Sequence, residues 1–403
     1  MKLIDKYWNN EKFYILRRQI KAWIQSVLFY IFRIFPINKR KIVFCCIEGT
    51  TGYTCSPKYI AEEIIKQKLD YELVWLVNDT SKKFPKRIKV VKNTLLNRAY
   101  HLTTAKVWIE NSRKQLEVRK RKGQVYFQTW HGKIGFKPIG LNRGASFSKI
   151  AYLVSKHDSE MIDYVITNSR WFEDDLQNGM LYKGPTLRIG SPRCDILLKN
   201  REKYIRNIRN RLHLPENAKL IMYAPTFRGG SQAVNRDVIA SSDELNYMYL
   251  INTLTEKFDG EWYMLLRQHP QVVARNLNKK YISDKVIDVS QIDDMYEILA
   301  GCDAFLSDYS SAVFDAAIMK IPIFIFAYDY EDYKNERGKL MWDLNELPFP
   351  FGTNEQELYN KIKLFDYNEY VIELEKLFEK VELIEDGKAS RRMIRELKKY
   401  LKQ

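Results

Sequence analysis

The stretch AFLSDYSSAVFDAAIMKIPIFIF, residues 304–326, contains the pattern that decides the fold. Ala304–Ser307 and Ile323–Phe326 are short, mostly apolar runs of the kind found in buried strands. Between them, Ala312–Met319 has the composition of a helix and begins directly after a pair of serines. A strand, a helix and a strand in such close succession predict two parallel strands joined by a covering helix.

The same alternation of strands and helices extends along most of the chain. It is interrupted at GSPRCD, residues 190–195, and a second series begins at Lys219. We therefore expect an α/β protein with two Rossmann-like domains that face each other, each with a parallel sheet covered on both faces. The expected domains are residues 39–192 and residues 193–403, and the second includes a basic C-terminal helix at Lys388–Lys402.

Size and composition agree with two globular domains and limit the partners. The chain has 403 residues, of which 45% are hydrophobic. Its net charge of +16 favours an anionic partner: a nucleic acid, an anionic membrane surface or a phosphate-rich substrate. The five cysteines show no metal-finger spacing, so we expect reduced cytosolic thiols. No cofactor is expected.

The first 38 residues form a separate segment. Ala22–Phe32 carries no charge, but it is too short to cross a bilayer. Basic residues flank it on both sides, and aromatic residues such as Trp23 and Phe29 suit the headgroup boundary of a membrane. We expect residues 1–38 to form an amphipathic helix that rests on an anionic membrane surface. A helix packed on the first domain is the alternative.

Candidate site residues follow four of the predicted strands, because open α/β sheets bind ligands at the carboxyl ends of their strands. The first segment is QTWHG at 128–132, in the first domain. His131 can accept a proton from an attacking hydroxyl, and Gly132 beside it is a candidate for substrate binding. A loop histidine without a chemical role is the alternative interpretation.

Two further segments lie in the second domain. YAPTFRGG at 223–230 places Arg228 beside two glycines, which suits the close approach of a phosphate. RQHP at 267–270 offers Arg267 and His269, which together can neutralise a pyrophosphate without a metal ion. Each segment taken alone could also be an exposed polar turn.

The fourth segment is DYSS at 308–311, directly before the predicted helix of the decisive stretch. The hydroxyl groups of Ser310 and Ser311, with the free backbone N–H groups of a helix start, predict an anion site. A plain N-cap would need only one serine. Asp308, at the end of the preceding strand, is a further candidate for substrate binding.

An acidic cluster follows the last apolar strand and includes Glu331 and Asp332. Its carboxylates could hold the hydroxyl groups of a ribose, as acidic residues do in nucleotide-binding folds. A hard metal ion or a solvated acidic loop are the alternatives.

Taken together and in this order, these segments resemble the CDP-glycerol glycerophosphotransferase family, the teichoic acid primases and polymerases. The family patterns QTWHG, YAPTWR, RxHP and DYSSxxFD correspond here to QTWHG, YAPTFR, RQHP and DYSSAVFD. YDYEDY at 328–333, the joint at 190–195 and DGKAS at 386–390 also resemble family patterns. The resemblance covers about residues 42–400.

The resemblance implies a GT-B type fold, with an acceptor domain followed by a CDP-alcohol donor domain, and it implies transfer without a metal ion. His131 and His269 would be the catalytic residues, with His131 as the base or as the residue that positions the acceptor. Which of the two histidines is the general base stays open. The resemblance implies contacts with the donor phosphates for Arg267, His269, Ser310 and Ser311, and weaker expectations for Asp308 and Glu331.

The implied reaction moves glycerol phosphate from CDP-glycerol to a lipid-linked teichoic-acid-like or capsular polymer and releases CMP, at the cytoplasmic face of the membrane. The family's aromatic-rich segment is replaced by Leu340–Asp343, which keeps CDP-ribitol as an alternative donor. A glycosyltransferase that uses a nucleotide sugar and an inactive membrane scaffold are further alternatives. No nucleic-acid motif is visible, so no nucleic-acid partner is expected. The sequence leaves open primase or polymerase action, the acceptor and a homo-oligomeric state.

Overall fold

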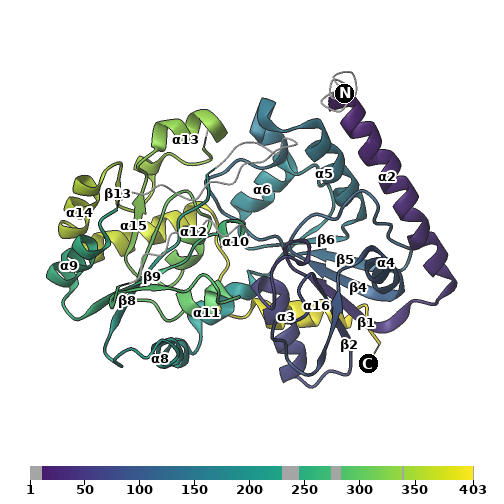
Figure 1. The fold of residues 1–403 in the computed structure, drawn as a ribbon, viewed down its shortest axis with the longest axis horizontal. Helices are drawn as coiled ribbons and strands as arrows, with labels where there is room; N and C mark the ends of the chain where they lie inside the picture. Colours follow the sequence, from purple (N-terminus) through teal and green to yellow (C-terminus); the bar gives the residue numbers. More distant parts are fainter. Residues whose placement is uncertain (1–10, 229–244, 274–282, 338–339, 403) are drawn as a thin grey trace.

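The computed structural model describes residues 11–228, 245–273, 283–337 and 340–402. It contains two parallel β-sheets, one in each half of the molecule, with helices packed around them (Figure 1). The first sheet has the strand order β3-β2-β1-β4-β5-β6-β7, and the second has the order β10-β9-β8-β11-β12-β13. The predicted α/β architecture with two parallel sheets is therefore confirmed.

The inner strands of the first sheet consist mostly of buried residues, as a sheet covered on both faces requires, whereas the edge strands are less buried. Its strands are β1 (Asn38–Cys45), β2 (Glu72–Val77), β3 (Ile88–Lys92), β4 (Ala105–Glu110), β5 (Val125–Gln128), β6 (Tyr164–Thr167) and β7 (Thr186–Arg188). The α-helices between them are α3 (Cys55–Lys66), α4 (Leu95–Thr104), α5 (Lys149–Met161) and α6 (Arg170–Gly179).

The second sheet repeats this construction. Its strands are β8 (Lys219–Tyr223), β9 (Trp262–Leu266), β10 (Val286–Asp288), β11 (Ala304–Ser307), β12 (Ile323–Phe326) and β13 (Phe351–Gly352). The helices of this half are α7 (Asp195–Leu198), α8 (Arg201–Arg211), α9 (Tyr247–Phe258), α10 (Pro270–Val273), α11 (Met295–Leu299), α12 (Ala312–Ala317), α13 (Tyr330–Arg337), α14 (Glu355–Lys363) and α15 (Tyr367–Lys380).

The decisive stretch folds as predicted. β11 and β12 pair in parallel, with Phe305 opposite Ile323, and α12 joins them. The helix ends at Ala317, two residues earlier than predicted, and the chain continues in turns in which the N–H of Met319 donates to the carbonyl of Ala316.

A buried ion pair joins the two halves behind the predicted site. The Nζ atom of Lys58, on α3, lies 2.6 Å from the Oδ2 atom of Asp294, which precedes α11, and both side chains are buried. The hydroxyl of Tyr59 donates to the same oxygen at 2.6 Å. Because a buried charge is costly without a partner, this pair couples the positions of the two domains.

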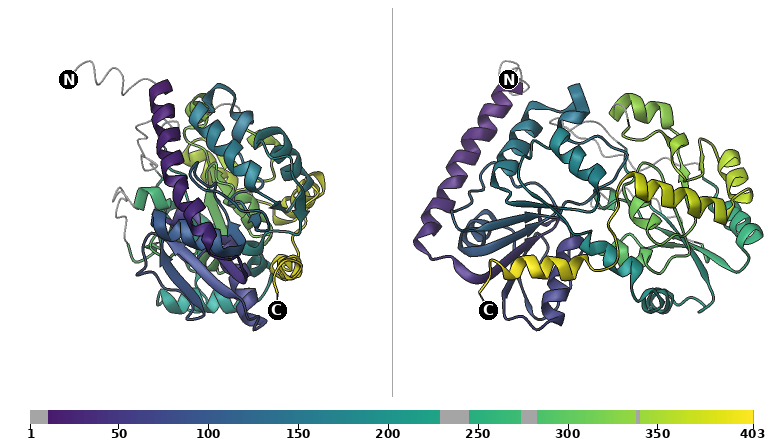
Figure 2. Two further views of the ribbon diagram at one scale, coloured as in Figure 1. Left: turned by 90° about the vertical axis from the view of Figure 1, so that its right-hand side faces the viewer. Right: turned by 180° about the vertical axis from the view of Figure 1, so that it is seen from behind.

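The C-terminal helix α16 (Ala389–Lys398) packs on the first sheet, although the sequence assigned it to the second domain. Its apolar residues Met393, Ile394 and Leu397 share a core cluster with β1 and α3. Figure 2 shows this helix, in yellow, beneath the first half of the molecule. The helix crosses back because its apolar stripe needs a partner surface, and the side of α3 supplies one.

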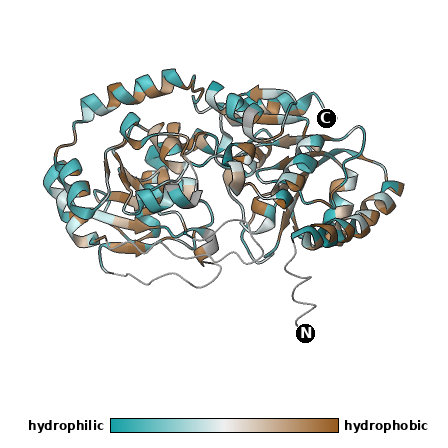
Figure 3. Ribbon diagram, turned by 90° about the horizontal axis from the view of Figure 1, so that it is seen from above, coloured by the Kyte–Doolittle hydropathy of each residue, from teal (hydrophilic) through white to brown (hydrophobic). Residues whose placement is uncertain are grey.

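The helix α2 (Glu11–Ile31) packs on the first domain along one side. Phe29 is fully buried in the same core cluster as residues of α4, and Arg18 donates to Gln115 at 3.1 Å. Figure 3 shows hydrophobic and hydrophilic residues interleaved along this helix. The exposed large apolar residues of α2 are Phe13, Leu16, Ile20, Trp23, Ile24, Val27, Tyr30 and Ile31. Within the described ranges, every helix is too short or too polar to cross a membrane.

Candidate active site

His131 follows β5 at the boundary between the two domains. Trp130 has a left-handed backbone with φ of 51°, which turns the chain sharply out of the sheet. The Nδ1 atom of His131 lies 2.7 Å from the carbonyl oxygen of Asn111. Because a carbonyl only accepts hydrogen bonds, Nδ1 carries the ring proton and Nε2 is left as a proton acceptor.

The surroundings of His131 keep its imidazole uncharged at neutral pH. Burial lowers its pKa to about 4, and the positive charges of Arg193 and Arg113 act in the same direction, whereas the bond to Asn111 opposes them. The side chain is nevertheless exposed, so a substrate can reach it. An accessible neutral imidazole is the state that a general base needs.

The loop after His131 touches the serines of the second domain. A Cβ atom added to Gly132 would lie 2.7 Å from the Oγ atom of Ser311, and one added to Gly135 would lie 3.2 Å from the Cβ of the same serine. A side chain at position 132 would therefore push the two segments apart. The structure thus brings His131, Gly132 and Ser311 together from segments far apart in the sequence.

Ser310 and Ser311 follow β11 and precede α12, as predicted. The Oγ atom of Ser310 accepts the N–H of Ala312 at 3.3 Å, and Ser311 is the N-cap residue of the helix. Both serines are half-buried at the domain boundary. Their predicted contact with donor phosphates stays a prediction.

Acidic residues of the second domain bind the guanidinium group of Arg228. Its Nη1 atom lies 2.8 Å from Asp308 and its Nη2 atom lies 3.0 Å from Asp329. Asp308 is buried and also accepts the N–H and the hydroxyl of Thr226. These contacts brace the loops after β8, β11 and β12 against one another. Direct contact of Arg228 or Asp308 with a substrate stays a prediction.

Arg267 follows β9, and its buried side chain forms hydrogen bonds to the loop after β10. Its Nη1 atom donates to the carbonyls of Val289 at 3.1 Å and Ile292 at 2.6 Å. Burial lowers its pKa to about 10. His269, two residues later, is half-buried, and the centroid of its ring lies 4.6 Å from that of Phe227. Contacts of Arg267 and His269 with a pyrophosphate stay predictions.

Glu331 and Asp332 lie exposed in the first turn of α13. The Nζ atom of Lys137, from the first domain, lies 5.7 Å from the ring centroid of Tyr333 on the same helix. Across the described ranges, no three His, Cys, Asp or Glu side chains gather in a group suited to a metal ion. The predicted ribose contacts of Glu331 and Asp332 stay predictions.

Sequence reasoning missed a buried ion pair beneath the site. The Nη2 atom of Arg193 lies 3.0 Å from the Oδ2 atom of Asp315, and its Nη1 atom donates to the carbonyl of Trp130 at 3.5 Å. The pair therefore links the joint, the helix α12 and the residue before His131. Arg193 lies in the motif GSPRCD and Asp315 in the motif DYSSAVFD, so membership of these motifs is the signal that could have indicated the two residues.

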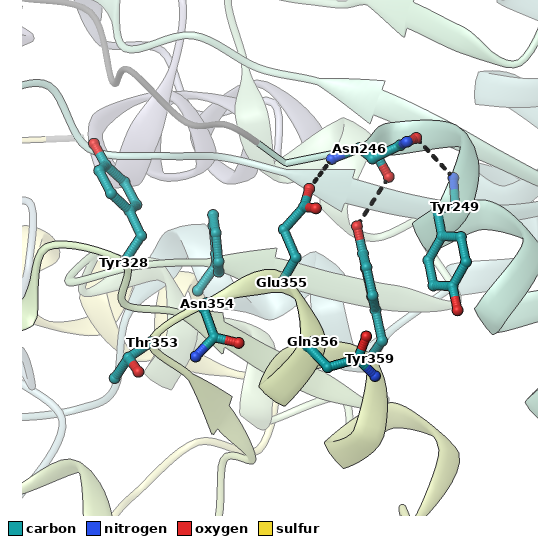
Figure 4. A pocket seen from close by; sticks show the side chains of 9 residues that line it. Asn246, Tyr249, Tyr328, Thr353, Asn354, Glu355, Gln356 and Tyr359 are labelled. Atoms are coloured by element: carbon teal, nitrogen blue, oxygen red, sulfur yellow. Dashed lines mark hydrogen bonds between the residues drawn. The ribbon is translucent and has the colours of Figure 1, made fainter.

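A separate cavity of about 800 Å³ opens beyond the ends of β12 and β13. Its lining includes Tyr328, whose ring also lies 5.4 Å from the guanidinium carbon of Arg228. Figure 4 shows its polar wall, where the N–H of Asn246 donates to Glu355 and the hydroxyl of Tyr359 donates to the carbonyl of Asn246. The cavity is lined by residues other than the predicted site residues.

Two parallel sheets that meet at a histidine loop and a serine-capped helix place the protein in the GT-B-like class. The chain belongs to the CDP-glycerol:poly(glycerophosphate) glycerophosphotransferase family, whose sequence model matches residues 27–399. The family membership and the transferase class expected from the motifs are thereby confirmed.

Individual relatives agree with this family. The chain is 30% identical over 398 residues to the teichoic acid glycerol-phosphate transferase of Staphylococcus aureus, covering 94% of this chain and 98% of that relative. It is 28% identical over 372 residues to the teichoic acid poly(glycerol phosphate) polymerase of Staphylococcus epidermidis, covering 88% of this chain and 50% of the relative. The chain thus spans about half the length of that polymerase.

The fold has a close counterpart among solved structures. The wall teichoic acid polymerase TagF aligns with a TM-score of 0.78 and 25% identity, covering 96% of this chain and 97% of the TagF chain. Because the alignment covers nearly all of both chains, the similarity includes both sheets and the boundary between them.

Proposed function

We propose that the protein transfers glycerol phosphate from CDP-glycerol to the terminal hydroxyl of a lipid-linked, teichoic-acid-like polymer and releases CMP. Family membership supports CDP-glycerol as the donor, because the description of the family names CDP-glycerol. The observation that carries the proposal is the position of His131, which has its Nε2 atom left as an acceptor and lies beside the serines at the start of α12. A base and an anion-binding segment from opposite domains suit transfer between two bound substrates.

In the proposed reaction, the acceptor hydroxyl attacks the phosphorus that carries the glycerol of CDP-glycerol. A new P–O bond forms to the acceptor, the P–O bond to CMP breaks, and Nε2 of His131 takes the hydroxyl proton. CMP leaves with the negative charge of the broken bond. Contacts with the donor phosphates are proposed for His269, Arg267, Ser310 and Ser311.

The remaining predicted residues have supporting parts in this proposal. Arg228 and Asp308 keep the donor-binding loops in register through their ion pair. Glu331 and Asp332 are exposed at the start of α13 and are proposed to bind the ribose hydroxyls of the donor. The first domain would then hold the acceptor and the second domain the donor.

The protein is proposed to work as a peripheral protein at the cytoplasmic face of the membrane. The support is the apolar outward side of α2, where Trp23 is 69% exposed and Ile24 is 58% exposed, together with basic residues such as Arg17 and Lys21 on the same helix. An apolar face bordered by positive charge suits an anionic membrane surface, where a lipid-linked acceptor is held.

The decisive experiment is a donor screen with the purified chain and a soluble glycerol phosphate oligomer as acceptor. We expect CMP release and elongation of the oligomer with CDP-glycerol. Faster reaction with CDP-ribitol would change the donor but keep the reaction. UDP release from UDP-sugars without CMP release from either CDP-alcohol would overturn the proposal.

A further inference from the structure

Arg113 lies beside the proposed base but takes no part in the reaction described above. It follows β4, and its guanidinium carbon lies 4.9 Å from the ring centroid of Trp130. The ring centroid of Trp130 in turn lies 4.9 Å from that of His131. Arg113 and His131 therefore both lie against the same indole ring.

Arg113 forms no close ion pair within the described part of the chain. Its Nη2 atom is buried and has no hydrogen-bond partner, and no carboxylate among the described residues lies within ion-pair distance of it. The charge of Asp158 acts on Arg113 from a longer distance, and its Oδ1 atom accepts the N–H of Lys114 at 2.9 Å and the hydroxyl of Tyr126 at 3.1 Å. A buried guanidinium N–H group without a hydrogen-bond partner is unfavourable, which points to an anion supplied from outside.

A second unpaired donor lies two residues earlier. Asn111 is fully buried, and its Nδ2 atom has no partner in the described part of the chain. Its other polar groups are occupied, since the side-chain oxygen accepts the N–H of Ile47 and the carbonyl binds His131. Two buried donors thus remain unsatisfied in the segment that also orients the base.

We propose that Arg113, assisted by Asn111, binds the phosphodiester next to the terminal hydroxyl of the acceptor polymer. The inference rests on the proposed function, in which His131 deprotonates that hydroxyl. In a glycerol phosphate polymer the charged group nearest to the terminal hydroxyl is this phosphodiester, so an anion site beside the base would place the hydroxyl for attack. A guanidinium suits the task because its N–H groups match two phosphate oxygens.

The test uses the full chain, CDP-glycerol and two soluble acceptors: a glycerol phosphate oligomer, and the same oligomer with its last phosphodiester replaced by a neutral methylphosphonate diester. We expect Arg113→Gln to raise the KM for the charged oligomer about 10- to 100-fold, the size of a lost charge-assisted hydrogen bond. The KM for CDP-glycerol should not change. With the neutral oligomer, wild type and Arg113→Gln should have similar KM values, because the partner of Arg113 is already missing.

Two further variants sharpen the result. Arg113→Lys keeps the charge but loses the paired N–H groups, so its KM should lie between those of wild type and Arg113→Gln. Arg206→Gln removes an equal charge from the exposed side of α8 and should leave both KM values unchanged. An equal loss of rate by Arg113→Gln with both oligomers, or a raised KM for CDP-glycerol, would overturn the inference.

Protein stability separates binding from a structural role. Removing a buried guanidinium with an unbonded N–H group should keep or raise the melting temperature of Arg113→Gln, whereas a structural arginine would lower it. If wild type releases CMP from CDP-glycerol with the charged oligomer but Arg113→Gln behaves like wild type, only this inference fails. If wild type releases no CMP at all, the proposed function itself fails.

Discussion

The two sides of the domain boundary use their positive charges in opposite ways. In the second domain, Arg228 is bound to Asp308 and Asp329, and Arg267 is bound to backbone carbonyls. In the first domain, Arg113 keeps an unsatisfied N–H group beside His131. The second-domain side is thus braced by its own contacts, whereas Arg113 keeps a donor that our proposal assigns to the acceptor polymer.

The largest effect is expected from the first-domain side. His131→Ala removes the proposed base and should lower kcat about 10²- to 10⁴-fold, measured as CMP release. His213→Asn is a matched control, because His213 lies in a turn with φ of 55°, a conformation that asparagine tolerates. A near-normal rate of the His131→Ala variant would show that the exposed histidine is not the base.

Removing the contacts between Arg228 and Asp308 in the second domain should lower the stability of the protein. Asp308→Ala removes the buried carboxylate that Arg228 and Thr226 share, and the loss of one partner of such a pair costs about 3–5 kcal/mol. We expect a melting temperature lower by several degrees, measured by circular dichroism. Asp332→Asn changes an exposed carboxylate and should melt like wild type. An unchanged melting temperature of Asp308→Ala would show that the brace is unimportant.

The contact between the two sides can be tested at Gly132. Gly132→Ala places a methyl carbon 2.7 Å from the Oγ atom of Ser311, so the segments must separate by a small distance. Misplacement of reacting groups by about 1 Å costs up to about 10²-fold in rate, and we expect a loss of kcat between tenfold and that limit. Wild-type kcat in this variant would mean that the two segments are not in contact during the reaction.

The pH dependence of the reaction rate tests how the nearby charges affect the pKa of His131. Because the pKa of His131 is lowered to about 4, the rate should stay constant from neutral pH down to about pH 5. It should fall as the pH falls through 4, where the imidazole becomes protonated. Arg113→Gln removes one of the charges that lower this pKa, so the fall should move to higher pH. The same midpoint in both proteins would contradict this account.

The smallest effect on catalysis is expected from α2, which lies away from the boundary (Figure 1). Replacing Ile20, Trp23 and Ile24 together by serine should reduce binding to anionic liposomes in a sedimentation assay, because these side chains are exposed. Transfer to a soluble acceptor should not change. Leu364→Ser alters an equally exposed residue of the second domain and is the control. Undiminished liposome binding of the triple variant would exclude this face as the membrane contact.

Several elements were predictable because their signals are local. Thr94 begins α4 through a side-chain bond to the N–H of Asn97, and the strands β11 and β12 lie at their predicted bounds.

The sequence by itself determined the family, the two parallel sheets and the positions of the site segments at strand ends. These follow from short motifs and from alternating apolar runs, which neighbouring residues establish. Only the tertiary structure decided that the helix α16 packs on the first sheet and that Arg193 pairs with Asp315. It also decided that Arg228 forms an ion pair while Arg113 keeps an unbonded N–H group. Pairing depends on distances between residues far apart in the chain, and no local pattern of residues contains those distances.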